Sequence, residues 1–90
     1  MVEAYTVEFL PEAHANLKRF SQPNAQRILN KINWLANNFD SLSREALTGE
    51  FKGLFKLRVG DYRVIYSVNN KQRVIIIHLI AHRRSIYERS

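Results

Sequence analysis

Residues 54–66 form the stretch LFKLRVGDYRVIY, which decides the fold of this chain. Apolar and polar residues alternate on both sides of the pair Gly60-Asp61. Such alternation around a Gly-containing pair predicts a β-hairpin closed by a two-residue turn. In this hairpin Val59 pairs with Tyr62, and that pairing fixes which side chains share each face of the sheet.

The predicted hairpin brings three cations together. Arg58 is expected directly opposite Arg63, with Lys56 diagonal to Arg63, because the turn sets the register. Like charges opposite one another destabilise a sheet by up to about 1 kcal/mol. A bound anion would remove that cost, so this face is a candidate anion-binding surface. The other face of the hairpin is apolar or aromatic, with Phe55, Leu57, Val59, Tyr62, Val64 and Tyr66.

Hydrophobic periodicity defines the remaining elements. They are a strand over residues 4–10, helices over 11–20 and 25–39, a connecting loop over 40–53, an apolar strand over 73–82, and a helical turn or tail over 83–90. Two helices with one apolar stripe each can cover only one face of a sheet. The sequence therefore predicts a single α+β domain over residues 1–90 with the order β-α-α-β-β-β. It would be a small, mostly antiparallel four-stranded sheet with two helices packed on one face.

The composition is that of an ordinary soluble globular protein, with 46% hydrophobic and 24% charged residues among 90. The absence of cysteine excludes disulfides and thiolate metal sites. No apolar run approaches the length of about 20 residues that spans a bilayer, and the N-terminus lacks the layout of a signal peptide. We therefore expect a cytoplasmic protein with no membrane partner.

The positive charge is concentrated in the second half of the chain. The net charge is +6, with five Lys/Arg against six Asp/Glu in residues 1–50 and nine against two in residues 51–90. Clustered positive charge suggests a polyanionic partner, most commonly a nucleic acid. The alternative interpretation is a solubilising surface.

The last predicted strand ends in His82-Arg83-Arg84, and Tyr87 follows three residues later. Antiparallel pairing with the preceding strand would place this end beside Arg63. Arg83 or Arg84, together with Tyr87, would then join the cationic face of the hairpin. Guanidinium groups can hold phosphate oxygens bidentately and an aromatic ring can stack on a base, so this composition suits a phosphodiester.

Three features resemble the RelE/ParE superfamily of toxins from bacterial toxin–antitoxin pairs. They are the hairpin KLRVGDYRVIY over residues 56–66, the β-α-α-β-β-β order, and the ending HRRSIY over residues 82–87. For the RelE branch the resemblance implies the toxin of a type II system, a ribosome-dependent endoribonuclease that inhibits translation by cleaving mRNA in the ribosomal A site. It also implies a metal-independent reaction that leaves a 2′,3′-cyclic phosphate, with no cofactor. The implied partners are the ribosome with its mRNA and a cognate antitoxin, in a heterotetramer or a larger complex.

The resemblance also assigns catalytic roles on the cationic face. Arg63, with Lys56 beside it, would stabilise the negative charge that the phosphate gains in the transition state. Tyr87 would be the general base, with neighbouring cations favouring its charged phenolate, or it would instead pack the tail or stack on a base. Arg83 would support the leaving 5′-oxygen, and His82 is the alternative proton donor there.

Three further cations, Lys52, Arg58 and Arg84, are expected to contact RNA. The chain departs from the family pattern at one position. Some RelE-like enzymes carry a lysine two residues before the position of Lys56, where this chain has Leu54. Lys52 is the candidate substitute for that lysine.

The histidines and the single tryptophan have other interpretations. Alternation along the last strand groups His82 with His78 and Ile80, and His78 is expected to be buried and hydrogen-bonded. His14 has no obvious partner, and three scattered histidines without cysteine argue against a metal site. Trp34 lies off the main apolar stripe of the second helix, so it is either packed at the margin or exposed to a partner.

Two other functions fit parts of the sequence. A ParE-like protein would inhibit DNA gyrase by binding, without a nuclease site, and would not need the cationic face and its C-terminal Arg and Tyr. A nucleic-acid-binding module without activity is a third interpretation. Against it, the face of the hairpin that carries the cations has no aromatic ring before Tyr87 on which bases could stack.

Overall fold

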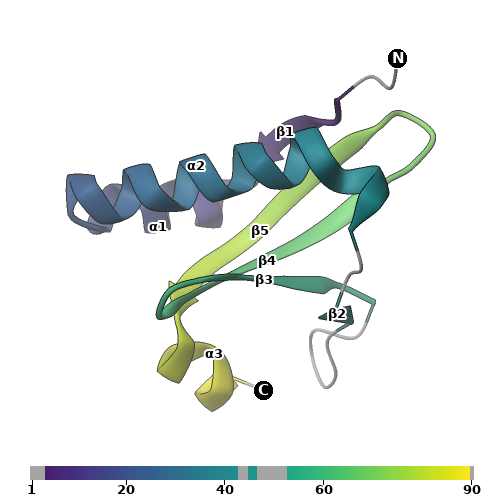
Figure 1. Cartoon of the computed structure of the whole chain (residues 1–90). Coiled ribbons are helices and arrows are strands. Elements are labelled where there is room, and N and C mark those ends of the chain that lie inside the picture. The colour runs from purple at the N-terminus through teal and green to yellow at the C-terminus, as the bar shows by residue number, and fades with distance from the viewer. Residues whose placement is uncertain (1–3, 43–44, 47–52, 90) are drawn as a thin grey trace.

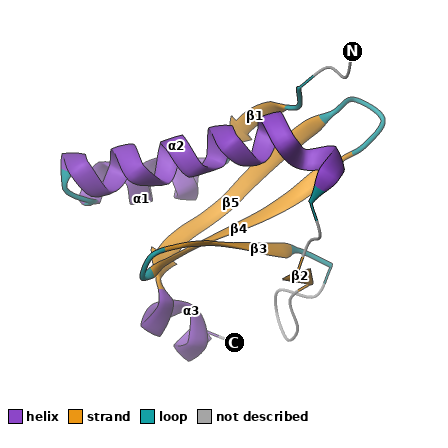
Figure 2. Ribbon diagram, in the orientation of Figure 1, coloured by secondary structure: helices purple, strands orange, loops and turns teal. Residues whose placement is uncertain are grey.

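The structure, a computed structural model, describes residues 4–42, 45–46 and 53–89. Its elements, coloured by type in Figure 2, are β1 (Thr6–Phe9), α1 (Pro11–Arg19), α2 (Gln22–Asn38), the 3-10 helix η1 (Phe39–Ser41), β2 (Glu45–Ala46), β3 (Phe55–Val59), β4 (Tyr62–Asn69), β5 (Val74–His82) and α3 (Arg83–Arg89). The strands form one sheet in the order β1-β5-β4-β3-β2. Helices α1 and α2 lie on one side of this sheet and α3 lies on the other (Figure 1).

The predicted α+β class and the order of its main elements are confirmed. The sheet is mixed, because β1 pairs parallel to β5 while all other pairs are antiparallel. The predicted loop over 40–53 contains an element that the sequence did not indicate: Glu45 and Ala46 of β2 pair with Lys56 and Phe55 of β3. A strand of two residues is too short to show any periodicity.

Local sequence signals explain where the two long helices begin. Pro11 begins α1, where its missing N–H leaves no bond unmade, and Glu12 adds a negative charge to the first turn. Ser21 caps α2, and its hydroxyl accepts a hydrogen bond from the backbone N–H of Asn24 at 3.4 Å. Helix α2 then presents one buried stripe to the sheet, formed by Ile28, Ile32, Leu35 and Ala36.

The hairpin of β3 and β4 has the predicted register. Val59 pairs with Tyr62, and Arg58 pairs with Arg63. Gly60 has a φ of +57°, as the first central residue of a tight hairpin turn requires. The apolar face of the hairpin packs under α1 and α2, as expected, and its core members are Val59, Val64 and Tyr66, with Phe55, Leu57 and Tyr62 partly buried.

The opposite face of the sheet is only partly open, and the expectation of a fully uncovered face is wrong. The helical alternative for residues 83–90 is the correct one, since α3 folds back onto this face. Its Ile86 is 2% exposed and packs with Ile65 and Leu79, with Leu54 at the margin. Helix α3 therefore builds a small second apolar cluster next to the cationic end of the hairpin.

A β-bulge corrects the alternation expected for the histidines. The pairing of β4 with β5 shifts between Ile65 and Tyr66, which leaves His78 as the extra residue in β5. Nε2 of His78 lies 2.7 Å from Oγ of Ser67, on the side of the sheet that α3 covers. His82 lies on the other side, so the two histidines do not share a face. The predicted hydrogen bond of His78 is present, although its side chain is only half-buried.

Candidate functional site

The pairing of β4 with β5 brings the end of β5 to the hairpin turn, as the sequence predicts. Arg63 pairs with Ala81, and Tyr62 pairs with His82. Helix α3 begins at the next residue, Arg83. The first turn of α3 and the turn of the hairpin therefore lie side by side at one end of the molecule (Figure 1).

Arg63 is held far more tightly than an ordinary surface arginine. It is 4% exposed, and its Nη1 donates hydrogen bonds to the carbonyl oxygens of Gly60 at 2.9 Å and of Tyr62 at 2.8 Å. Its Nε is buried and has no hydrogen-bond partner within the described residues. A buried, unsatisfied N–H destabilises the folded state, and an acceptor that reached it would relieve that cost. The side chain is thus a fixed cation whose charge is not balanced by a carboxylate among the described residues.

Arg83 is positioned by the hairpin turn. Its backbone N–H donates to the carbonyl oxygen of Asp61 at 2.7 Å, and its Nε lies 3.9 Å from Oδ1 of the same residue. Both side chains are more than half exposed, so this long ion pair is weak and leaves Arg83 able to turn to a ligand. The sequence indicated only a turn role for Asp61. The contact between Asp61 and Arg83 could have been predicted, because the end of the last strand was expected to approach the hairpin turn and Asp61 carries a negative charge there.

His82 lies on the other side of the sheet from the cationic face. Its ring is 5.9 Å from the ring of Tyr62, centroid to centroid, in an edge-on arrangement. Its Nδ1 accepts a hydrogen bond from the backbone N–H of Arg84 at 3.3 Å. The structure therefore groups His82 with Tyr62 under the helices, and does not place it beside Arg63.

The other candidates occupy the rim of this region. Lys56 is half-buried on β3 opposite Ile65, while the side chains of Arg58 and Arg84 are exposed. Tyr87 belongs to α3 and follows Ile86, the residue that docks this helix on the sheet. Lys52 lies outside the described residues.

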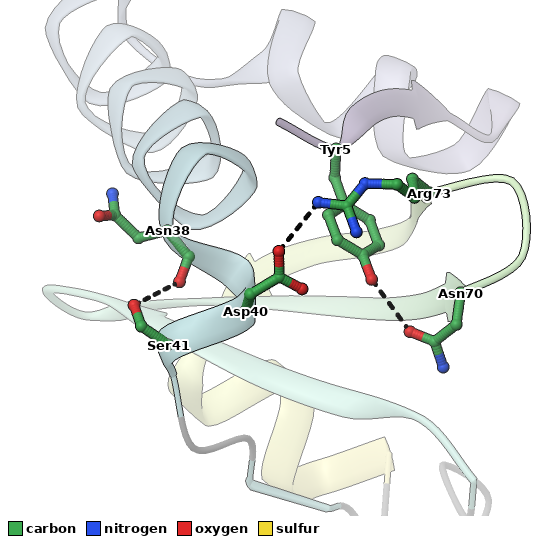
Figure 3. A network of polar contacts seen from close by, with 6 residues as sticks. All are labelled: Tyr5, Asn38, Asp40, Ser41, Asn70 and Arg73. Atoms are coloured by element: carbon green, nitrogen blue, oxygen red, sulfur yellow. Dashed lines mark hydrogen bonds and ion pairs between the residues drawn. The ribbon is translucent and has the colours of Figure 1, made fainter. Parts of the chain in front are cut away.

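A second arginine-centred cluster lies at the opposite end of β5 (Figure 3). Arg73 has a φ of +56°, its Nη2 lies 2.9 Å from Oδ2 of Asp40, and its guanidinium carbon lies 4.3 Å from the ring centre of Tyr5. The hydroxyl of Tyr5 in turn donates to Oδ1 of Asn70 at 3.2 Å. This arginine is neutralised by a carboxylate and stacked on a ring, so its contacts are those of a structural residue.

Two kinds of feature are absent from the part of the chain that the structure describes. No three His, Asp or Glu side chains there form a group that could hold a metal ion. No helix there is long and apolar enough to cross a membrane.

The fold matches solved structures of small bacterial and archaeal toxins bound to their antitoxins. The RelBE2 toxin–antitoxin complex of Mycobacterium tuberculosis contains a chain with a TM-score of 0.79 and 22% identity, with 91% of this chain and 94% of that chain covered. The archaeal RelE–RelB complex of Pyrococcus horikoshii contains one with a TM-score of 0.71 and 29% identity, with 90% and 97% covered. These matches define the class of protein by its fold.

Sequence comparison then gives the family. The family model described as the ParE toxin of the type II toxin–antitoxin system parDE matches residues 7–87. Toxin RelG of Mycobacterium tuberculosis is 33% identical over 91 residues, which cover 94% of this chain and 98% of RelG. The chain belongs to the RelE/ParE superfamily of type II toxin–antitoxin toxins. The resemblance carried by the hairpin, the element order and the HRRSIY ending is therefore confirmed.

Proposed function

We propose that this toxin is a ribosome-dependent mRNA endoribonuclease that stops translation by cutting mRNA in the ribosomal A site. The observation that carries the proposal is Arg63, a 4% exposed cation that is fixed by two backbone carbonyls and has no carboxylate partner among the described residues. Binding alone can be achieved by exposed, mobile cations. A reaction that builds negative charge on a phosphate needs a fixed cation.

The reaction suited to this surface is internal transesterification of RNA. The 2′-oxygen of a ribose attacks the adjacent phosphorus, a new P–O bond forms, and the bond from phosphorus to the 5′-oxygen breaks. The 2′-hydroxyl loses its proton to a base, and the departing 5′-oxygen gains one. The products are a 2′,3′-cyclic phosphate and a 5′-hydroxyl, and no metal ion or cofactor is required by this chemistry.

Arg63 takes the central role in this proposal, since its fixed guanidinium can donate to nonbridging phosphate oxygens as their charge increases. Tyr87 is the proposed base for the 2′-hydroxyl, with its helix anchored beside the hairpin. Arg83 supports the leaving 5′-oxygen electrostatically, because a guanidinium rarely releases its proton. His82 is the weaker candidate for that step, since its ring contacts Tyr62 on the other side of the sheet. Lys56 completes the cation set.

The remaining proposed contacts concern partners. Arg58 and Arg84 are exposed cations that can hold mRNA or ribosomal RNA through phosphate contacts. Lys52 is proposed for the same role on the basis of sequence alone. A cognate antitoxin is the proposed inhibitor, as the similar toxins from Mycobacterium tuberculosis and Pyrococcus horikoshii were solved in complexes with theirs. We expect the assembly to be a heterotetramer or larger.

Inhibition of DNA gyrase by binding is the second candidate function. It is favoured by the family model that matches the chain, which is that of a ParE toxin. Under this alternative the cationic end of the hairpin would be a contact surface, and its individual charges would be replaceable. The two candidates therefore differ in how sharply activity depends on Arg63.

The test maps mRNA 5′ ends on translating ribosomes after brief expression of the toxin. Wild-type toxin is expected to create new ends within the A site, and Arg63→Gln, Arg83→Gln and Tyr87→Phe are expected to abolish them. Arg19→Gln removes the same charge from an exposed helix end and is the matched control. Growth arrest without new mRNA ends, accompanied by trapped gyrase–DNA breaks, would support the gyrase alternative and refute the nuclease.

A further inference from the structure

A hollow of about 520 Å³ lies between α2 and the turn of the hairpin. Arg27, Lys31 and Trp34 line it from α2, and Arg58 and Gly60 line it from the hairpin. Its size is within the range of small-ligand pockets, about 300–1,000 Å³. We propose that this hollow binds one nucleotide of single-stranded RNA, with the base on Trp34 and the phosphate among the three cations.

The charge of the hollow is unbalanced. Arg27, Lys31 and Arg58 all line it, and none of the three forms an ion pair with a carboxylate among the described residues. Cations gathered around a concave surface raise the local concentration of anions. A phosphate group held by two guanidiniums and an ammonium would offset part of this charge.

Trp34 supplies the contact that a base requires. It is 41% exposed, and Nζ of Lys31 lies 3.8 Å from the centre of its ring, over one face, so a base would stack on the opposite face. An exposed indole beside cations is the arrangement with which single-stranded nucleic acids are stacked and held. An acidic peptide would use the cations but would leave the indole without a stacking partner, so the nucleotide is the occupant that accounts for all four side chains.

Gly60 allows the hollow to form next to the turn. A Cβ at this residue would lie 2.9 Å from Nη2 of Arg27, closer than real Cβ contacts come. The glycine that the hairpin turn needs for its positive φ therefore also admits Arg27 to the turn. A residue with a Cβ at this position would force this guanidinium to shift.

Arg58, on the edge of the hairpin, lies between the hollow and the candidate site. This residue lines the hollow, and it pairs across the hairpin with Arg63. A single strand of RNA could thus place one nucleotide on Trp34 and a later phosphate near Arg63. The hollow would act as a second contact that fixes the path of the strand and not as a second centre of reaction.

Trp34 is the single tryptophan of the chain, so its fluorescence reports on the hollow alone. The purified toxin is titrated with a 2′-O-methyl RNA hexamer, which cannot be cleaved through its 2′-oxygens. We expect saturable quenching of the Trp34 emission, and Arg27→Gln should weaken the apparent affinity by about tenfold. The Trp34→Leu variant is measured instead by the fluorescence anisotropy of a labelled hexamer, and its affinity should be about tenfold lower than that of the wild type. Arg19→Gln, which removes an equal charge from α1, should change the affinity less than twofold.

Three results would overturn the proposal. The emission could stay unchanged at saturating hexamer, or Arg19→Gln could weaken binding as much as Arg27→Gln does. Inorganic phosphate or tetraglutamate could also quench Trp34 as fully as the hexamer, which would assign the hollow to anions or to an acidic protein segment. Because the probe is not a substrate, none of these results depends on whether the toxin cleaves mRNA.

Discussion

The arginines at the two ends of the long β4–β5 pair have opposite environments. At one end Arg73 is matched by Asp40 and stacked on Tyr5, so its charge is used inside the protein (Figure 3). At the other end Arg63 is more deeply buried, has no carboxylate among the described residues, and donates only to carbonyls of the hairpin turn. The first arrangement stabilises the fold, whereas we propose that the second provides a positive charge for a phosphate outside the chain.

Under this proposal, the difference offers a way to distinguish structural cations from functional ones in a basic protein. Net charge alone cannot do so, because every lysine and arginine contributes equally to +6. Burial without a counter-ion is the informative property, since desolvating an unpaired cation is unfavourable for folding. The predictions that follow test whether the two ends can be separated, or even interchanged, by substitution.

The largest effect is expected from Arg63→Gln. Loss of a fixed donor to the transition state should slow mRNA cleavage by about 100- to 1,000-fold. The free energy of unfolding should fall by about 1–3 kcal/mol, because the two hydrogen bonds from Nη1 to the carbonyl oxygens of Gly60 and Tyr62 are lost, so activity is compared where the variant is fully folded. Single-turnover cleavage on programmed ribosomes and urea denaturation give the two values. Wild-type cleavage by the fully folded variant would make Arg63 a structural residue, like Arg73.

Ile86→Ala should detach α3 from the sheet. Removing a side chain that is 2% exposed should weaken the docking of this helix by about 2 kcal/mol or more. Amide hydrogen exchange should accelerate within residues 83–89, while the amides of β4 stay protected. Cleavage should fall as well, since Arg83 and Tyr87 belong to that helix. Ser85→Ala, at an exposed position of the same helix, is the control and should change neither value.

Ala81→Glu should convert the functional end into a copy of the structural one. Ala81 pairs directly with Arg63, and Cβ atoms of directly paired residues lie about 4.5–5.5 Å apart. The new carboxylate should form an ion pair with Arg63 and compete with phosphate, so cleavage should fall at least about tenfold while the fold is retained. Ala81→Gln has the same size without the charge. Equal loss of activity in both variants would mean that bulk, and not neutralisation, is responsible.

The smallest effect is expected at the structural end. Arg73→Gln should lower the free energy of unfolding by about 1 kcal/mol, because it removes a partly exposed ion pair and a cation–π contact. Cleavage should be unchanged. Thermal denaturation of Arg73→Gln, Asp40→Asn and the double variant measures the coupling between the two side chains. Lys71→Gln, at an exposed position of the adjacent turn, controls for the change in net charge.

Much of the cationic end could be predicted from residues 54–66. The alternation of apolar and polar residues and the Gly60-Asp61 turn determine the register of the hairpin. The pairing of Arg58 with Arg63, and the position of Arg83 near the hairpin turn, follow from that register. The burial of Arg63 could not be predicted, because the hydrogen bonds that hold it go to backbone carbonyls, which every sequence has.

Three features could not be predicted from the alternation of apolar and polar residues, because each depends on an irregularity or on packing between distant elements. The bulge at His78 adds one residue to β5, and a shift by one residue exchanges the two faces of a strand. Among the side chains of α3 that the structure describes, Ile86 is the apolar one that packs on the sheet, and one residue is too little to define a periodic pattern. The hollow beside Trp34 arises where α2 passes the hairpin turn, so it depends on packing between elements far apart in the sequence.

The parallel pairing of β1 with β5 has a consequence for the order of folding. It joins segments from opposite halves of the chain: Thr6 pairs with Val74, and Tyr5 contacts Asn70. The β3–β4 and β4–β5 hairpins close much shorter loops, and short loops lose less chain entropy on closure. We therefore expect the cationic hairpin to form early and the β1 contacts, including the neighbourhood of Arg73, to form in the last step. Folding kinetics would then show Arg73→Gln acting mainly on the rate of unfolding, with little effect on the rate of folding.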